Sequence, residues 1–122
     1  MDKLQTNATV LIVPGLREHV PEHWQTLLQA RLLKVHAVAP LEHNKLSLAA
    51  RVEAIQQALE QIDGPVILVG HSAGVLTLVP WAQRQQRPIK GALLAAPPDP
   101  DCDRHANYPT PATLRENGWD PL

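Results

Sequence analysis

Apolar residues along the chain form short continuous runs that alternate with stretches of helical period. Four of the runs are rich in Val, Ile, Leu and Ala and are mostly bounded by Pro or Gly. Such runs are typical of strands buried on both faces of a parallel sheet. We therefore expect strands over residues 9–13, 35–39, 66–69 and 90–96.

Between these runs, apolar residues recur every three or four positions, as on one face of a helix. The clearest case is 47–62, where Ser47 is a suitable N-cap and Asp63-Gly64-Pro65 ends the helix. Another helix is expected to begin at Pro21, and a third over 73–84, kinked or shortened by a proline. This order predicts an α/β fold with three α/β/α layers and a mainly parallel sheet.

The character of the chain changes after the last predicted strand. Half of its twelve prolines lie from Pro97 onward, and no periodic run of helical length follows. A single helical turn is expected over 113–117, with Gly118 as its stop. We predict one domain over residues 1–122 that carries an irregular, proline-rich tail over 97–122.

The junction of the third strand and the third helix reads Gly70-His71-Ser72-Ala73-Gly74. Gly-x-Ser-x-Gly in this context is typical of a nucleophile elbow, a sharp turn that lifts the serine hydroxyl above the sheet. The turn forces Ser72 into a sparsely populated backbone region, and side chains at Gly70 and Gly74 would collide with the crossing elements. Ser72 is therefore the candidate nucleophile.

Charge and composition exclude several partners. A net charge of −1 and a pI near 6.6 give no electrostatic reason to expect binding to nucleic acid or to an anionic membrane. We find no signal peptide and no apolar run of membrane-spanning length. The single cysteine, Cys102, cannot form an internal disulfide, so a cytoplasmic location is expected.

Four segments together resemble a known family. They are Val13-Pro14-Gly15 after the first strand, Pro21-Glu22-His23-Trp24 at the first helix, the elbow, and Ala95-Ala96-Pro97-Pro98. The chain resembles, over nearly its whole length, the small single-domain serine hydrolases of the α/β-hydrolase superfamily. The resemblance is to the YdeN-like, retinoblastoma-binding-protein-9-like group.

The resemblance implies hydrolysis of a small carboxylic ester or amide through an acyl-Ser72 intermediate, with no cofactor. It also implies an oxyanion hole built from the backbone N–H of Ala73 and an N–H of the Gly15-Leu16 loop, assigned here to Leu16. A serine hydroxyl is a weak nucleophile unless a histidine removes its proton and a carboxylate orients that histidine.

The family's acid and base follow later strands, and neither matches a position in this chain. The fourth strand is apolar like an interior strand, yet no predicted strand follows it. We therefore expect an α/β-hydrolase core whose last strands are missing, in an apparently truncated chain with weak activity or none. An edge strand with unpaired backbone N–H and C=O groups can pair with a strand of another chain. The alternative is a non-catalytic interaction module that uses this edge and the proline-rich tail, including a homo-oligomer through the fourth strand.

Residues inside the chain are candidates for the missing roles. Asp99 and Asp101 follow the fourth strand, His19 lies in the loop that faces the elbow, and His105 lies in the tail. Nothing in the sequence fixes either imidazole near Ser72. His71 is expected to be a packing residue, because neighbouring side chains at an elbow point apart.

Two metal-like patterns fail on geometry. His19-Val20-Pro21-Glu22-His23 matches the inverted zinc protease pattern, but Pro21 begins the helix and leaves His19 outside it. The run that begins at Asp99 resembles a calcium loop but holds Arg104 and Thr110 where Gly and Glu are needed. We expect no metal site, and we treat Cys102 as a bystander.

Overall fold

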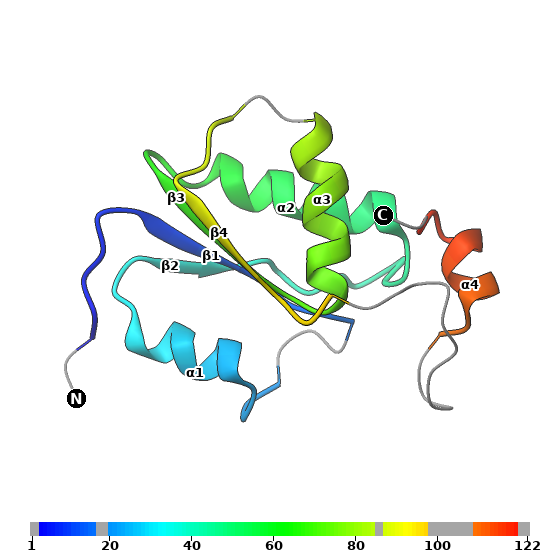
Figure 1. The fold of residues 1–122 in the computed structure, drawn as a ribbon, viewed down its shortest axis with the longest axis horizontal. Coiled ribbons are helices and arrows are strands. Elements are labelled where there is room, and N and C mark those ends of the chain that lie inside the picture. Colours follow the sequence, from blue (N-terminus) through cyan, green and yellow to red (C-terminus); the bar gives the residue numbers. More distant parts are fainter. Residues whose placement is uncertain (1–2, 17–19, 85–86, 98–108, 120–122) are drawn as a thin grey trace.

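A computed structural model describes residues 3–16, 20–84, 87–97 and 109–119 of the chain. Strands and helices alternate along it (Figure 1). The strands are β1 (Thr9–Val13), β2 (Val35–Ala37), β3 (Val66–His71) and β4 (Gly91–Ala95). The helices are α1 (Trp24–Arg31), α2 (Leu48–Glu60), α3 (Ala73–Arg84) and α4 (Pro111–Glu116).

The four strands form one parallel sheet in the order β2-β1-β3-β4. Helix α1 lies on one face of the sheet, and α2 and α3 lie on the other (Figure 1). This arrangement confirms the predicted three-layer α/β fold. The register pairs Val13 with Gly70, so that the carboxyl ends of β1 and β3 meet at the same edge of the sheet.

Two apolar layers form the core, because successive side chains of a strand point to opposite faces. Leu11 and Val13 of β1 pack with residues of α2 and α3, among them the buried Trp81. Val10 and Ile12 of the same strand pack against the residues of α1. The continuous apolar runs predicted as strands therefore supply both layers at once.

Helix α2 matches its predicted span closely and is capped at both ends. The Ser47 side chain accepts a hydrogen bond from the backbone N–H of Ala50, as expected of an N-cap. At the other end, the Arg87 guanidinium donates to the carbonyls of Leu59, Ile62 and Gly64 at 2.7–2.9 Å. Leu59 lies in the last turn of α2 while Ile62 and Gly64 follow the helix, so Arg87 ties the connection between α2 and β3 to the segment after α3.

Some predicted features differ from the structure. Helix α1 begins at Trp24 rather than Pro21, because the His23 side chain caps it by accepting from the N–H of Gln25. Strand β2 ends at Ala37, two residues before the predicted end, although Val38 still donates to the Ile12 carbonyl. Helix α3 keeps its full predicted length with Pro80 inside it, so of the two expected effects, a kink or a shortening, the shortening does not occur.

The described part of the tail is ordered by packing. The predicted helical turn is α4, which begins at Pro111 and ends before Gly118, whose positive φ of 92° suits glycine. Leu114 and Trp119 are buried against the first turns of α3, and the Trp119 indole donates to the Leu46 carbonyl. Residues 98–108 and 120–122 lie outside the described residues.

The last strand of the sheet is exposed. Within the described residues β4 pairs with β3 alone, and Leu93 and Leu94 are 52% and 46% exposed. An apolar strand thus occupies an edge, as the sequence predicts. None of the described helices has the length and apolar character needed to cross a membrane.

Candidate active site

Ser72 occupies the sharp turn between β3 and α3. Its φ is +55°, in the left-handed region that side chains rarely adopt, and such a backbone costs on the order of 1–3 kcal/mol. Two backbone bonds hold it there: Ser72 N–H donates to the Ala95 carbonyl at 2.9 Å, and its own carbonyl accepts from Val75 at 3.0 Å. The neighbouring strand and the first turn of the helix therefore fix the strained residue.

A second strained position lies beside the first. Ala96 follows β4 with a φ of +52°, directly after the residue whose carbonyl accepts from Ser72. Both strained residues therefore lie at the carboxyl edge of the sheet, where open parallel sheets bind their ligands. Strain of this kind concentrates at functional sites.

The two elbow glycines meet different neighbours. A Cβ at Gly74 would overlap the Val13 carbonyl oxygen and lie 2.8 Å from the Pro14 oxygen, and both are backbone atoms that cannot rotate away. A Cβ at Gly70 would lie 2.7 Å from the Leu78 Cδ1, the end of a flexible side chain. The close approach of β1 and α3 therefore depends most strictly on Gly74.

The loop after β1 lies against the elbow. A Cβ built at Gly15 would be 3.4 Å from both the His71 oxygen and the Ser72 Cβ, and 3.8 Å from the Ala73 nitrogen. Leu16 is half-buried against a cluster that includes Ala73, Leu114 and Trp119. The structure thus brings Ser72, Ala73 and the Gly15-Leu16 loop together.

Gln25 contributes a contact that the sequence analysis missed. Its side chain is buried, at 3% exposure, and its Nε2 donates to the carbonyls of Val13 at 3.2 Å and Val69 at 3.0 Å. Val13 is the last residue of β1, and Val69 lies two residues before the end of β3, so both carbonyls are close to the Gly15 loop and the elbow. The sequence does hold a signal for this contact: Gln25 lies one turn before Leu28 and two turns before Leu32, which places this polar side chain on the apolar face of α1.

His71 packs against the beginning of α1. Its Nδ1 accepts from the Trp24 indole at 3.0 Å, which leaves the ring proton on Nε2, and its ring meets that of His23 edge-on at 4.4 Å. Burial, and secondarily the charge of His23, lower the pKa of His71 below its usual value of 6.5. These contacts give His71 the packing role that the sequence predicts.

A base and an acid for Ser72 are not assembled in the described residues. The Ser72 hydroxyl has no hydrogen-bond partner in residues 3–16, 20–84, 87–97 and 109–119. The sequence candidates His19, His105, Asp99 and Asp101 lie outside these ranges, as do Cys102 and Arg104.

The zinc-like pattern is only partly described, because His19 lies outside the described residues. His23 uses its Nδ1 to cap α1 and lies before the helix instead of on its face. In the described part of the chain, no three His, Cys, Asp or Glu side chains gather as metal ligands would.

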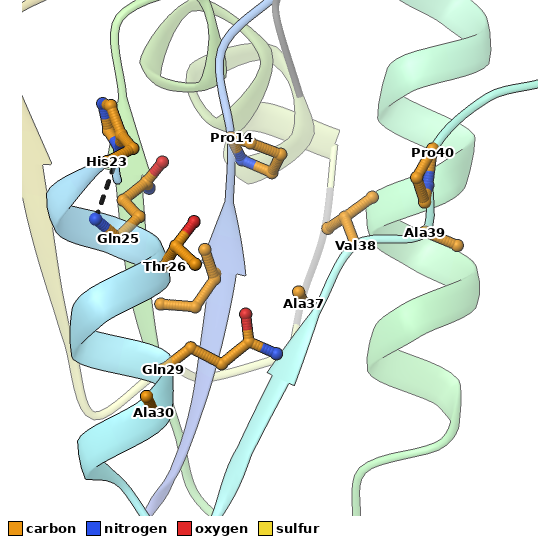
Figure 2. Close-up of a pocket in the computed structure, with 11 residues that line it drawn as sticks. Pro14, His23, Gln25, Thr26, Gln29, Ala30, Ala37, Val38, Ala39 and Pro40 are labelled. Atoms are coloured by element: carbon orange, nitrogen blue, oxygen red, sulfur yellow. Dashed lines mark hydrogen bonds between the residues drawn. The ribbon is translucent and has the colours of Figure 1, made fainter. Parts of the chain in front are cut away.

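A cavity of about 430 Å³ opens between α1 and the edge strand β2 (Figure 2). Pro14 and His23 border it where it approaches the elbow, and Gln29 reaches into it from α1. Its lining consists of Ile12, Pro14, His23, Gln25, Thr26, Gln29, Ala30, Ala37, Val38, Ala39 and Pro40. Ser72 is not among these residues, so the cavity lies beside the elbow and not over it.

Comparisons with known proteins agree with this geometry. Residues 10–120 match the sequence model of a family described as serine hydrolase. The fold is similar to the crystal structure of a protein described as a YdeN-like hydrolase from Pectobacterium atrosepticum SCRI1043, at 36% sequence identity and a TM-score of 0.70. The similarity covers 76% of this chain and 50% of that protein, so the chain spans about half of its length. No curated protein matches the chain.

Proposed function

The chain belongs to the serine hydrolase family, and on that premise we propose that Ser72 is a nucleophile toward small carboxylic esters or amides. The supporting observation is the +55° φ of Ser72 at a strand-to-helix turn that the Gly15 loop contacts. In the proposed reaction Ser72 Oγ bonds to the carbonyl carbon while a base takes its proton. The tetrahedral intermediate then expels the alcohol or amine, and water releases the acid from the acyl-serine.

Two backbone N–H groups are proposed to stabilise the oxyanion, those of Ala73 and Leu16. Ala73 is the first residue of α3, where free N–H groups and the helix dipole favour negative charge. The contact of Gly15 with Ser72 supports the position of the second donor. Loss of one such donor typically lowers the rate about 10²–10³-fold.

We propose that the 122-residue chain turns over substrate weakly or not at all. The support is the Ser72 hydroxyl, which bonds to no imidazole in the described ranges, together with the lack of positions that match the family's acid and base. Four residues stay open as internal substitutes: His19 or His105 as the base, and Asp99 or Asp101 as the acid.

The test is intact mass after incubation with a fluorophosphonate probe, with Ser72→Ala as the control. A single adduct that disappears in the control supports an activated Ser72, with a base from His19, His105 or a second chain. An adduct that persists in Ser72→Ala refutes the assignment of the nucleophile. Absence of any adduct means that the elbow lacks its base, and rapid ester turnover that depends on Ser72 refutes the proposed weak activity.

A second candidate function is association through the edge of β4, which the exposure of Leu93 and Leu94 favours. Pairing of two copies along this strand would satisfy its free backbone groups and cover both side chains. The test is light scattering after size exclusion over a range of concentrations, with Leu93→Lys as the variant. A native chain that stays monomeric at every concentration counts against the homo-oligomer.

A further inference from the structure

We propose that Gln25 is a positioning residue for the oxyanion hole. Its carboxamide ties the last residue of β1 to Val69 of β3 and so helps to fix the spacing between the Gly15-Leu16 loop and the elbow. This inference rests on the proposed role of Ser72 and adds a residue of α1 that takes no direct part in the reaction.

The geometry of the two bonds supports this role. Val13 and Val69 are neighbouring carbonyls on paired strands, because Val13 is in register with Gly70. One carboxamide nitrogen bridges them at 3.2 Å and 3.0 Å, with the Gln25 side chain almost fully buried. A carboxamide offers two N–H donors, and here both are used.

The Val13 carbonyl is held from its other side as well. It lies so close to Gly74 of α3 that a side chain there would overlap it. The oxygen is therefore confined between the Gln25 amide of α1 and the Gly74 backbone of α3. Since Pro14 and Gly15 follow directly, any movement of this carbonyl is passed on to the loop that contacts Ser72.

The start of α1 is anchored by its own contacts. His23 accepts from the Gln25 N–H, and the Trp24 indole donates to His71, the residue before Ser72. Figure 2 shows His23 and Gln25 close together at this end of the helix. Gln25 thus extends from an end of α1 that is fixed to the elbow. Its bonds can therefore hold the Gly15-Leu16 loop at a constant distance from Ser72.

A small displacement is enough to matter chemically. Oxyanion donors act at 2.7–3.1 Å from the developing charge, and a misplacement of about 1 Å can lower a rate about 10²-fold. If Gln25 loses its donors, the Val13 and Val69 carbonyls each lose one buried hydrogen bond and keep only the bond that the parallel β1–β3 ladder supplies, so this part of the two strands is held less firmly. The donor of the Gly15-Leu16 loop is then no longer held at a fixed distance from that of Ala73.

The first test compares Gln25→Met with Leu32→Ala. Methionine keeps the volume of the side chain and removes both donors, whereas Leu32 is a buried residue at the other end of α1 whose side chain has no donor for the Val13 and Val69 carbonyls. The readout is phosphonylation of Ser72 by a fluorophosphonate, resolved into its maximal rate and its half-saturation concentration and corrected for the folded fraction. We expect Gln25→Met to lower the maximal rate tenfold or more, with half-saturation within threefold. Leu32→Ala should leave both within threefold.

The Gln25→Glu variant supplies a pH signature. Its carboxylate has no donor for the two carbonyls, whereas the protonated acid has one, and burial raises the pKa of such a group. The ratio of the variant rate to the native rate should therefore fall as pH rises. A ratio that stays constant between pH 5 and pH 8 contradicts the positioning role.

A second measurement separates this proposal from the proposed function. If native protein is not phosphonylated, the elbow lacks its base, and if Ser72→Ala reacts equally well, the assignment of Ser72 fails. In both cases Gln25 is still tested through the amide signals of Gly15, Leu16 and Ala73 in NMR spectra. Gln25→Met should shift or broaden these signals, and Leu32→Ala should not. The proposal is overturned if the signals do not change in Gln25→Met, or if they change equally in Gln25→Met and Leu32→Ala. An equal loss of the phosphonylation rate in the two variants also overturns it.

Discussion

Gly74 provides the sharpest test of how β1 meets the elbow. The change is Gly74→Ala, which adds one methyl group at the second residue of α3. In an open helix interior this substitution stabilises by about 1 kcal/mol, because alanine is the better helix former. Here the new Cβ would overlap the Val13 carbonyl oxygen and lie 2.8 Å from that of Pro14.

The expected change in the free energy of unfolding depends on which atoms must move to make room for the new methyl group. Overpacking by a methylene costs about 1–3 kcal/mol, and a clash with backbone belongs at the upper end because no rotamer relieves it. After the gain in helix propensity is subtracted, we expect a net loss of about 2 kcal/mol. Gly70→Ala meets only the end of the Leu78 side chain, at 2.7 Å, and should cost less.

The matched control is Gly91→Ala at the start of β4, where an added Cβ meets no atom within 4 Å. Alanine inside a strand is favoured over glycine by about 0.5–1 kcal/mol, so this variant should be slightly more stable than the native chain. Urea unfolding followed by the fluorescence of the buried Trp81 and Trp119 measures all three free energies. If Gly74→Ala is as stable as the native chain, the close approach of β1 to α3 is wrong.

Two further outcomes are expected. Trp119→Ala should lower the free energy of unfolding by about 3–5 kcal/mol in the same urea experiment, because the ring is 2% exposed and its indole donates to the Leu46 carbonyl. A loss below about 1 kcal/mol would contradict the packing of residues 109–119. The pKa of His71 is lowered in the folded chain, so the unfolded chain takes up the proton first and stability is lost as pH falls below about 6.5. The urea midpoint of the native chain should therefore drop more between pH 7 and pH 5 than that of His71→Gln, whose amide oxygen keeps an acceptor for Trp24, and equal drops would contradict the pKa direction.

The strands, the main helices and the elbow could be predicted because their signals are local. Apolar runs bounded by Pro or Gly specify buried strands, and the two glycines around Ser72 reflect close approaches that the structure contains. The position of Ser47 likewise identified the cap of α2 from residues within one turn. Such features need no knowledge of what lies elsewhere in the chain.

Contacts between distant segments could not be predicted in this way. Gln25 reads as an ordinary polar residue of α1 until Val13 and Val69 are placed beside it. Trp119 lies among prolines and polar residues, and only the fold shows that Leu46 accepts its indole proton. The acid and base of a serine hydrolase are also set by distant segments, and for this reason periodicity and spacing do not identify them.

The burial of residues 109–119 also bears on how the chain folds during synthesis. Leu16 and Ala73 are made early, yet both pack in one cluster with Leu114 and Trp119. Domains begin to fold while the ribosome is still adding residues, at about 5–20 residues per second. The strands of the sheet can therefore pair before Trp119 has been synthesised. The apolar cluster beside the elbow is complete only after that residue leaves the ribosome. A nascent chain therefore exposes the apolar surface of Leu16 and Leu76 during that interval, and the surroundings of Ser72 are completed only at the end of it.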